Sequence, residues 1–343
     1  MGARLTDPRR GRAYAFGMNS VDPLAQDAAR RGPLFVVLNA GSGRHQGGAE
    51  EQVMAQVFSQ AGREFEFLHI QDAARINEIA NRAVALARAR RGVVVAAGGD
   101  GTISAVAGAV LGSGCPFGVL PEGTFNYFGR DNAIPQDTEA AARALLGASI
   151  SPVQVGQVNG RVFLVNASVG LYPQLLEDRE AWKKKWGRSR FVAFVSGIAT
   201  LLKWRKQLHL SIESAGQAAT LRTPTLFVGN NRLQLARVGI DEKEVKAVEA
   251  GELAGIVVRP IGTLAMLGLL LRGVLGRLGD ADHVSSFSFR RLTVTPKLRK
   301  RRNRIKVATD GETVWMQPPL LFQVAAEPLL LLVPAPADRA EVA

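Results

Sequence analysis

The stretch Gly98-Gly99-Asp100-Gly101-Thr102 stands between two apolar runs, residues 93–97 before it and residues 103–106 after it. This pattern predicts a buried strand, a tight turn and the start of a helix. Glycine lets the backbone approach a ligand closely, and amides at a helix N-terminus bind phosphate oxygens. A carboxylate among such amides calls for a cation between it and the phosphates, so Asp100 indicates a metal–nucleotide phosphate site. Taken alone, these five residues also fit an ordinary turn after a strand.

Two further segments have the same form. The apolar residues 118–121 run into Glu122-Gly123-Thr124-Phe125-Asn126, and residues 35–38 run into Asn39-Ala40-Gly41-Ser42-Gly43. If all three strands belong to one parallel α/β sheet, the three turns open at its carboxyl edge, where such sheets bind ligands. None of the three is a P-loop, because no Gly-Lys-Ser/Thr ends any of them.

Together, the segments Asn39–Gly43, Gly98–Thr102 and Leu120–Asn126 resemble the three nucleotide motifs of the diacylglycerol kinase catalytic-domain superfamily, which includes sphingosine, ceramide and bacterial lipid kinases. Asp310-Gly311-Glu312 is similar to the late Asp-Gly-Glu motif of the same family. The resemblance covers roughly residues 34–333, and it is far more specific for the superfamily than for the lipid.

The order of the expected elements gives the fold class. Residues 34–149 alternate between strands and helices, which predicts an N-terminal Rossmann-like parallel α/β domain with helices on both faces of its sheet. Residues 150–333 are expected to form an antiparallel β-sandwich domain, with the active site in the cleft between the two domains. We expect a mobile basic leader at residues 1–33 and a tail at residues 334–343.

The β-sandwich is expected from a series of strand signals. A hairpin closed by Asn159-Gly160 comes first, and helical insertions near residues 189–203 and 261–278 interrupt the series. The later expected strands are Gln207–Ser214, Leu221–Gly229, Leu253–Arg259, Ser285–Pro296, Arg304–Thr309 and Leu320–Ala325.

The resemblance implies that ATP and Mg²⁺ are the cofactors and that the γ-phosphoryl group passes to a lipid hydroxyl. Asp100 is the expected metal-organising residue, and Glu312 is the expected general base, so both are catalytic. Asp310 is expected to cap its own turn. Ala250 replaces the aspartate with which many bacterial relatives hold a second, structural Mg²⁺. The residues expected to contact the nucleotide are Asn39, Ser42, Gly43, Gly98, Gly99, Gly101, Thr102, Gly123, Thr124 and Asn126.

Composition fits a globular protein. The 343 residues are 47% hydrophobic and 21% charged, which is enough to build two cores. A single cysteine, Cys115, excludes an internal disulfide framework and any cysteine-rich metal site. No apolar stretch reaches the roughly 20 residues of a spanning helix, and no secretory signal is apparent. We therefore expect a cytoplasmic protein that associates peripherally with membranes.

The net charge of +13 is concentrated in two places. Residues 290–306 contain nine Lys or Arg residues and no acid, and Trp182-Lys183-Lys184-Lys185-Trp186 forms a second cluster. Basic clusters bind phosphate backbones, or simply face solvent. Tryptophans beside lysines favour an anionic membrane surface instead, so we expect no nucleic-acid partner.

The sequence is compatible with two competing functions. NAD kinases share the Gly-Gly-Asp-Gly motif, but the resemblance to them predicts an Asn-Glu pair after it, and Asn77-Glu78 comes before it. A non-catalytic lipid- or nucleotide-binding protein on the same fold is disfavoured because Asp100 and Glu312 are both present. Among lipids with a free hydroxyl, diacylglycerol is the first expectation, and ceramide or a sphingoid base is the second. The sequence also allows a homodimer.

Overall fold

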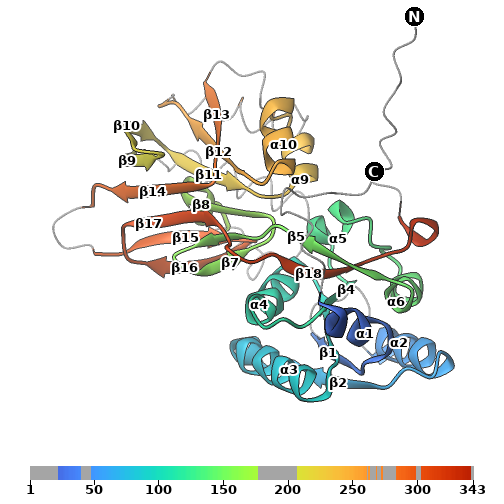
Figure 1. Ribbon diagram of the computed structural model, residues 1–343. Coiled ribbons are helices and arrows are strands. Elements are labelled where there is room, and N and C mark those ends of the chain that lie inside the picture. Colours follow the sequence, from blue (N-terminus) through green and yellow to red (C-terminus); the bar gives the residue numbers. More distant parts are fainter. Residues whose placement is uncertain are drawn as a thin grey trace, which may run out of the picture.

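The computed structural model describes residues 22–39, 48–176, 207–260, 283–298 and 303–340, together with Gly262, Gly268 and Arg272. Three six-stranded sheets organise these residues. One sheet, flanked by helices, forms an α/β domain, and the other two form a β domain beside it (Figure 1). The expected fold class, a parallel α/β domain followed by an antiparallel β domain, is confirmed.

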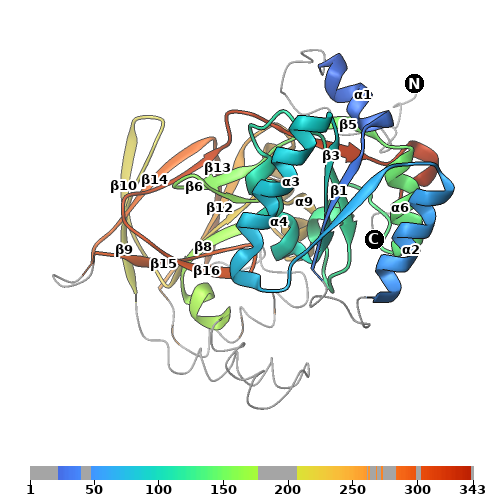
Figure 2. The same ribbon diagram turned by 90° about the horizontal axis from the view of Figure 1, so that it is seen from below.

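Helices cover both faces of the first sheet. Helices α3 (Ile76–Arg90) and α4 (Asp100–Val110) pack together on one face, while α2 (Gly48–Gln60) and α6 (Thr138–Leu146) pack on the other (Figure 1 and Figure 2). Along the buried strands, successive side chains point to opposite faces of the sheet and pack into two separate apolar cores, as strand geometry requires. The strands, in order across the sheet, are β2 (Phe65–His69), β1 (Leu34–Leu38), β3 (Val93–Gly98), β4 (Phe117–Pro121), β18 (Leu329–Val333) and β5 (Ser149–Val153).

Strands β5 and β18 correct the expected domain boundaries. Both lie almost wholly within residues 150–333, the range expected to form the second domain, yet they pair within the first sheet. Strand β18 runs parallel to β4, and β5 pairs antiparallel with β18 along its whole length. The chain therefore leaves the α/β domain after β5 and forms the sandwich. It then returns to the α/β domain, where β18 lies between β4 and β5.

Helix α1 corrects the expected leader. Pro23–Arg31 is a helix whose first turn is capped by Asp22, since the Asp22 Oδ1 accepts from the Leu24 amide at 2.9 Å. Ala25, Ala28 and Ala29 are buried on one face of this helix. The spacing of these alanines gives an apolar stripe, which explains why the segment packs although it lacks large apolar residues. Residues 1–21 of the expected leader lie outside the described part.

The second domain is a sandwich of two antiparallel sheets whose inner faces share one apolar core. Phe163 and Phe322 from one sheet and Val169 and Leu253 from the other are among its members. One sheet of the sandwich contains, in order, β10 (Gln217–Thr223), β9 (Leu208–Ser214), β14 (Arg291–Pro296), β17 (Leu320–Val324), β6 (Gly156–Val158) and β7 (Arg161–Phe163). The second contains β13 (Val284–Phe289), β12 (Leu253–Val258), β11 (Thr225–Gly229), β8 (Asn166–Gly170), β15 (Ile305–Thr309) and β16 (Glu312–Met316).

Several expected strands were merged or missed. Residues 221–229 and 285–296 were each expected to be one strand, but each contains the end of one strand and the start of another, in different sheets. The chain therefore crosses between the layers at Pro224 and at Arg290. Strands β16 and β18 were not expected. The helical insertion near residues 189–203 lies outside the described residues, as does nearly all of the one near 261–278.

The remaining helices are short. Those whose bounds lie within the described residues are the 3-10 helices η1 (Ala73–Arg75) and η2 (Pro336–Asp338), and the α-helices α5 (Tyr127–Asp131), α9 (Arg232–Arg237) and α10 (Glu242–Glu249). Within the described ranges, no helix combines the length and the hydropathy that crossing a membrane requires.

Candidate active site

The glycine-rich turn, residues Gly98–Thr102, joins β3 to α4, as the sequence predicts. A Cβ atom at Gly98 would lie 2.8–2.9 Å from the side chain of Thr102, so the turn leaves no room for any other residue. The Thr102 hydroxyl in turn accepts a hydrogen bond from the Asn39 Nδ2, at 3.0 Å. The ends of β1 and β3 are thereby joined at the carboxyl edge of the sheet.

The turn after β4 lies directly against the glycine-rich turn. A Cβ atom at Gly123 would lie 2.7 Å from the Cα of Gly99, so the two backbones are in contact. Asn126 adopts a left-handed conformation, and its Nδ2 donates to the Gly123 carbonyl (3.0 Å) and to the Gln136 Oε1 (2.9 Å). Its own Oδ1 is buried and has no partner among the described residues. Thr124 is exposed.

Asp100 points toward the turn after β4. Its two carboxylate oxygens accept from the amides of Tyr127 and Phe128, each at 3.3 Å, at the start of α5. Burial raises the pKa of Asp100, and these backbone hydrogen bonds oppose the rise. The carboxylate thus ties the two turns together.

Glu122 is a further carboxylate at this edge that the sequence did not single out. Burial and the neighbouring Glu50 raise the pKa of Glu122 to about 7. Its Oε1 is buried and has no partner among the described residues. The amide of Glu122 donates to the Gly98 carbonyl, at 2.9 Å, which places this residue beside the glycine-rich turn.

The late motif forms the turn between β15 and β16. Asp310 and Gly311 both have positive φ angles, 47° and 88°, as a tight hairpin turn requires. The Asp310 carboxylate accepts four hydrogen bonds: one from the Ser104 hydroxyl (2.6 Å), and three from the amides of residues 164–166 (2.7–2.9 Å). Burial raises the pKa of Asp310 to about 6 against the effect of these donors.

The contact with Ser104 joins the two domains. Ser104 belongs to α4 of the α/β domain, whereas residues 164–166 and Asp310 belong to the β domain. One carboxylate therefore anchors the late motif to its own sheet and to the helix that follows the glycine-rich turn. Asp310 was expected to cap its own turn, but its printed hydrogen bonds instead join segments that are distant in the sequence.

Glu312 lies just past this anchor, at the start of β16. Its Oε2 accepts a hydrogen bond from the Arg161 Nη2 at 2.9 Å. Its Oε1 lies 3.4 Å from the position that a Cβ atom would occupy at Gly101. The late motif and the glycine-rich turn, about 200 residues apart in the sequence, therefore lie next to each other.

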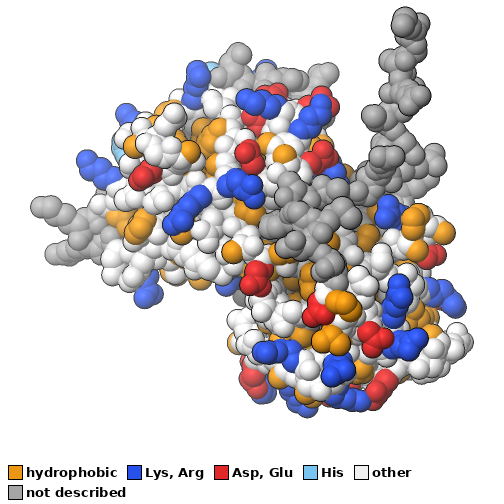
Figure 3. Space-filling model, viewed as in Figure 1, with side chains coloured by type: hydrophobic (Ala, Val, Ile, Leu, Met, Phe, Trp, Pro, Cys, Tyr) orange, Lys and Arg blue, Asp and Glu red, His pale blue; other side chains and the backbone are white. Residues whose placement is uncertain are grey.

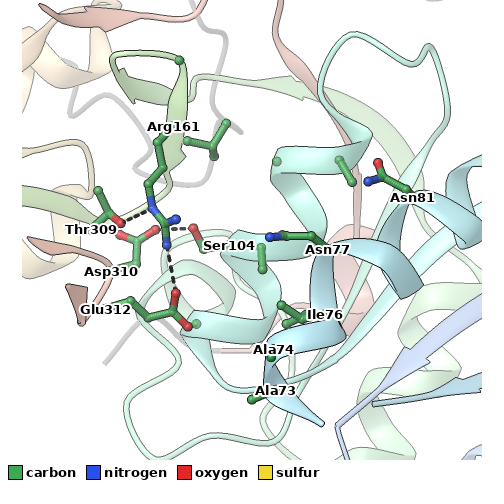
Figure 4. Close-up of a pocket in the computed structure, with 16 residues that line it drawn as sticks. Ala73, Ala74, Ile76, Asn77, Asn81, Ser104, Arg161, Thr309, Asp310 and Glu312 are labelled. Carbon is green, nitrogen blue, oxygen red and sulfur yellow. Dashed lines mark hydrogen bonds and ion pairs between the residues drawn. The ribbon is translucent and has the colours of Figure 1, made fainter. Parts of the chain in front are cut away.

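A cavity of about 450 Å³ opens where the two motifs meet. Its walls come from α3, α4, the hairpin of β6 and β7, and the turn between β15 and β16 (Figure 4). Asn77, Asn81, Ser104 and Arg161 are polar lining residues that the sequence did not predict. The four-residue spacing of Asn77 and Asn81 on a helix, and the place of Arg161 after the Asn159-Gly160 turn, were the available signals.

Of the expected nucleotide-contacting residues, the structure brings together Asn39, Gly98, Gly99, Thr102, Gly123 and Asn126 at the carboxyl edge, with Gly101 and Glu312 beside the cavity. Ser42 and Gly43 lie outside the described residues. The described part of the chain contains no group of three or more His, Cys, Asp or Glu residues placed to hold a metal ion. Glu249, next to Ala250, accepts a hydrogen bond from the Arg232 Nη1 at 2.6 Å.

Comparison with known proteins points to one family. Residues 33–158 match the family model of the diacylglycerol kinase catalytic domain. A "Probable lipid kinase YegS-like" of Pseudomonas aeruginosa is 40% identical over 124 residues, which are 35% of this chain and 40% of that protein. A diacylglycerol kinase of Bacillus subtilis is 39% identical over 89 residues, 25% of this chain and 29% of that protein. The chain thus spans well under half of the length of these relatives.

The fold extends the likeness beyond the matched sequence. A crystal structure of a diacylglycerol kinase from Bacillus anthracis superposes with a TM-score of 0.63 at 16% identity. The superposition covers 90% of this chain and 98% of that one, so the sandwich is included. Residues 33–158 therefore belong to the diacylglycerol kinase catalytic-domain superfamily, and the sandwich that follows them shares the fold of a diacylglycerol kinase.

Proposed function

We propose that this protein is a lipid kinase that transfers the γ-phosphoryl group of ATP to a hydroxyl group of a membrane lipid. The observation that carries the proposal is the approach of Glu312, from the sandwich, to Gly101 of the glycine-rich turn, since its Oε1 lies 3.4 Å from the position of a Cβ atom there. A carboxylate that faces a phosphate-binding turn is what phosphoryl transfer to a hydroxyl requires. The names of the relatives, lipid kinase and diacylglycerol kinase, support the same chemistry.

We propose that ATP occupies the cavity and the adjoining turns. A volume of about 450 Å³ lies within the range of small-molecule sites. We place the phosphates at the backbone amides of Gly99, Gly101 and Gly123, since amides at such turns bind phosphate oxygens. The polar side chains of Asn77 and Ser104 would then contact the rest of the nucleotide.

The residues at this edge also fit Mg²⁺. This ion prefers oxygen ligands, and it is usually held by one or two carboxylates together with substrate phosphates and water. Asp100 offers a carboxylate, and the Asn126 Oδ1 is a buried oxygen with no partner among the described residues. When bound, Mg²⁺ would neutralise the charge of the phosphates.

We assign the role of general base, which activates the lipid hydroxyl, to Glu312. In the proposed step, a bond forms between the lipid hydroxyl oxygen and the γ-phosphorus, and the bond to the β,γ-bridging oxygen of ATP breaks. Glu312 accepts the hydroxyl proton, and ADP leaves. Its Oε1 faces Gly101, so the base stands beside the amides that would hold the phosphates.

Diacylglycerol is our first choice of acceptor, and ceramide or a sphingoid base is the second. The experiment incubates the protein with Mg²⁺ and γ-labelled ATP, and with micelles of each lipid in turn, beside a sample with NAD. Label in the lipid extract supports the proposal, and the lipid that carries it names the acceptor. Label on NAD alone would instead identify a soluble nucleotide kinase, and no label in any sample would overturn the proposal.

Replacement of Asp100 tests the phosphate end of the site. Asp100→Asn should lower kcat/KM for Mg²⁺–ATP by more than about tenfold, because the metal loses a charged ligand. Asparagine offers one oxygen to the two backbone amides that now bond to the carboxylate, so the thermal midpoint should fall by a few degrees, and both proteins are assayed at a temperature at which they are folded. Asp137→Asn is the matched control, since Asp137 caps α6 and asparagine caps helices equally well. Turnover of Asp100→Asn within tenfold of wild type would contradict the assignment.

We further propose that an anionic membrane surface recruits the protein, which in the cell would be cytoplasmic and peripherally membrane-associated. Trp182–Trp186 lies outside the described residues, and so do residues 299–302 of the cluster at residues 290–306. On the face in Figure 3, Lys and Arg side chains of the described part stand among acidic ones rather than in one patch. Among the described residues, Trp315 is half exposed, with the Lys306 Nζ 4.7 Å from its ring centre.

Binding to vesicles tests this recruitment. Sedimentation with phosphatidylserine vesicles should fall as salt rises. Replacement of Lys183, Lys184 and Lys185 by serine should weaken binding by about 1 kcal/mol for each lysine near the surface. Replacement of Lys243 and Lys246, on α10, by serine is the control and should have little effect. Binding that does not change with salt concentration, or no binding at all, would mean that the clusters face solvent and do not bind a membrane.

A further inference from the structure

We propose that Arg161 is a positioning residue that holds Glu312 in the orientation needed for proton transfer. The inference rests on the proposed function, because it concerns the base of that reaction. Arg161 is the first residue of β7, directly after the Asn159-Gly160 turn, and it lines the cavity opposite α4 (Figure 4).

The guanidinium group of Arg161 makes two directed hydrogen bonds. Its Nε donates to the Thr309 Oγ1 and its Nη2 donates to the Glu312 Oε2, each at 2.9 Å (Figure 4). Thr309 is only 3% exposed, so its hydroxyl is a fixed point at the end of β15. Because the guanidinium is planar, a bond that fixes Nε also fixes the direction of Nη2.

The ion pair with Arg161 leaves one carboxylate oxygen of Glu312 available to accept the hydroxyl proton. With Oε2 engaged by Arg161, Oε1 is the oxygen that faces Gly101. A glutamate at the start of an edge strand has several rotamers open to it, and only some of them direct the carboxylate into the cleft. Arg161 selects the rotamer that points toward the glycine-rich turn.

The solvent exposure of Arg161 and Glu312 indicates that their ion pair adds little to the stability of the fold. The side chains of Arg161 and Glu312 are 39% and 55% exposed, and ion pairs at such exposure contribute little to stability. The loss of Arg161 should therefore affect the reaction far more than the fold. A misplacement of about 1 Å at a reacting group can lower the rate roughly 10²-fold.

The experiment compares steady-state kinetics of Arg161→Met and Arg161→Lys with wild type, using the lipid that wild type phosphorylates. Methionine keeps much of the length without a donor, so kcat should fall about 10- to 100-fold while the KM for ATP stays within about twofold. Lysine can still pair with Glu312, although it cannot reproduce the two-pronged geometry, so it should restore part of the loss. Arg143→Met is the matched control, because Arg143 forms an exposed pair with Glu139 on α6, outside the cavity.

A double variant separates positioning from direct phosphate binding. If Arg161 acts through Glu312, adding Arg161→Met to Glu312→Gln should lower kcat by no more than about twofold further. If Arg161 binds the phosphates instead, its removal should raise the KM for ATP and lower the rate equally in both backgrounds, which would overturn the inference. Equal kcat for wild type and Arg161→Met would overturn it as well. Should wild type itself phosphorylate no lipid, the proposed function fails first, and the inference falls with it.

Discussion

Glu312→Gln should lower kcat by about 10²- to 10⁴-fold with little change in the affinity for ATP. Glutamine keeps the size of the side chain and can still accept a hydrogen bond from Arg161, so the local geometry should survive. What it cannot do is take the proton of the lipid hydroxyl. The measurement is steady-state transfer of phosphate to the lipid, with ATP binding followed separately by calorimetry.

A matched control exists for this substitution. Glu64 is also an exposed glutamate paired with an arginine, Arg90, but it lies beside β2, and it does not line the cavity. Glu64→Gln should leave kcat unchanged. Turnover of Glu312→Gln near that of wild type would remove Glu312 from the role of base.

Asp310→Asn should lower the free energy of unfolding by about 4 kcal/mol at neutral pH. The carboxylate accepts four hydrogen bonds, and an asparagine has one oxygen to accept them. Its amide group would face backbone N–H donors, and each buried donor left without an acceptor costs about 1–3 kcal/mol. Denaturant unfolding of the whole chain measures the effect, with Asp137→Asn as the control that should change it by less than about 0.5 kcal/mol.

The pH dependence of stability gives a second readout for Asp310. Burial raises its pKa from the usual 3.8 to about 6, so the folded protein binds this proton more tightly than the unfolded chain does. The resulting contribution to stability is complete below pH 3.8 and is lost as the pH rises through about 6. Asp310→Asn should show a weaker decline across this range. If the variant is instead fully folded but inactive, while Glu312→Gln turns over, the roles of the two residues are reversed.

Local patterns predicted the α/β domain well, because each element there carries its own signal. The apolar runs at residues 35–38 and 93–97 end in polar turns, and such short buried strands in alternation with helices leave few topologies. The hairpin turns at Asn159-Gly160 and Asp310-Gly311 were also recognisable, since these residue types tolerate positive φ angles.

Long-range pairing accounts for the errors. Strand β18 is an apolar run near the end of the chain, and nothing local says that Leu331 pairs with Phe117 across more than 200 residues. The runs at 221–229 and 285–296 look like single strands because the residues at each crossing, such as Pro224, can also stand at a strand end. Residue type alone does not reveal that a strand changes sheets.

The same limit applies to the site. Asp100, Glu312 and the glycines were predictable because each stands in a motif with a chemical meaning. Arg161, Ser104 and Asn77 stand in no motif, and they reach the cavity only because the sandwich packs against α3 and α4. Their roles follow from contacts between segments far apart in the sequence.

The most direct test of the central claim, that the two motifs form one phosphoryl-transfer site, is a single-turnover experiment. Protein in excess over γ-labelled ATP is mixed with micelles of the preferred lipid, and the label in the lipid extract is followed with time. We predict transfer of the label to the lipid by wild type and, at equal occupancy of ATP, transfer by Glu312→Gln that is slower by about 10²-fold or more. Equal rates for the two proteins, with both folded and loaded with ATP, would contradict the account.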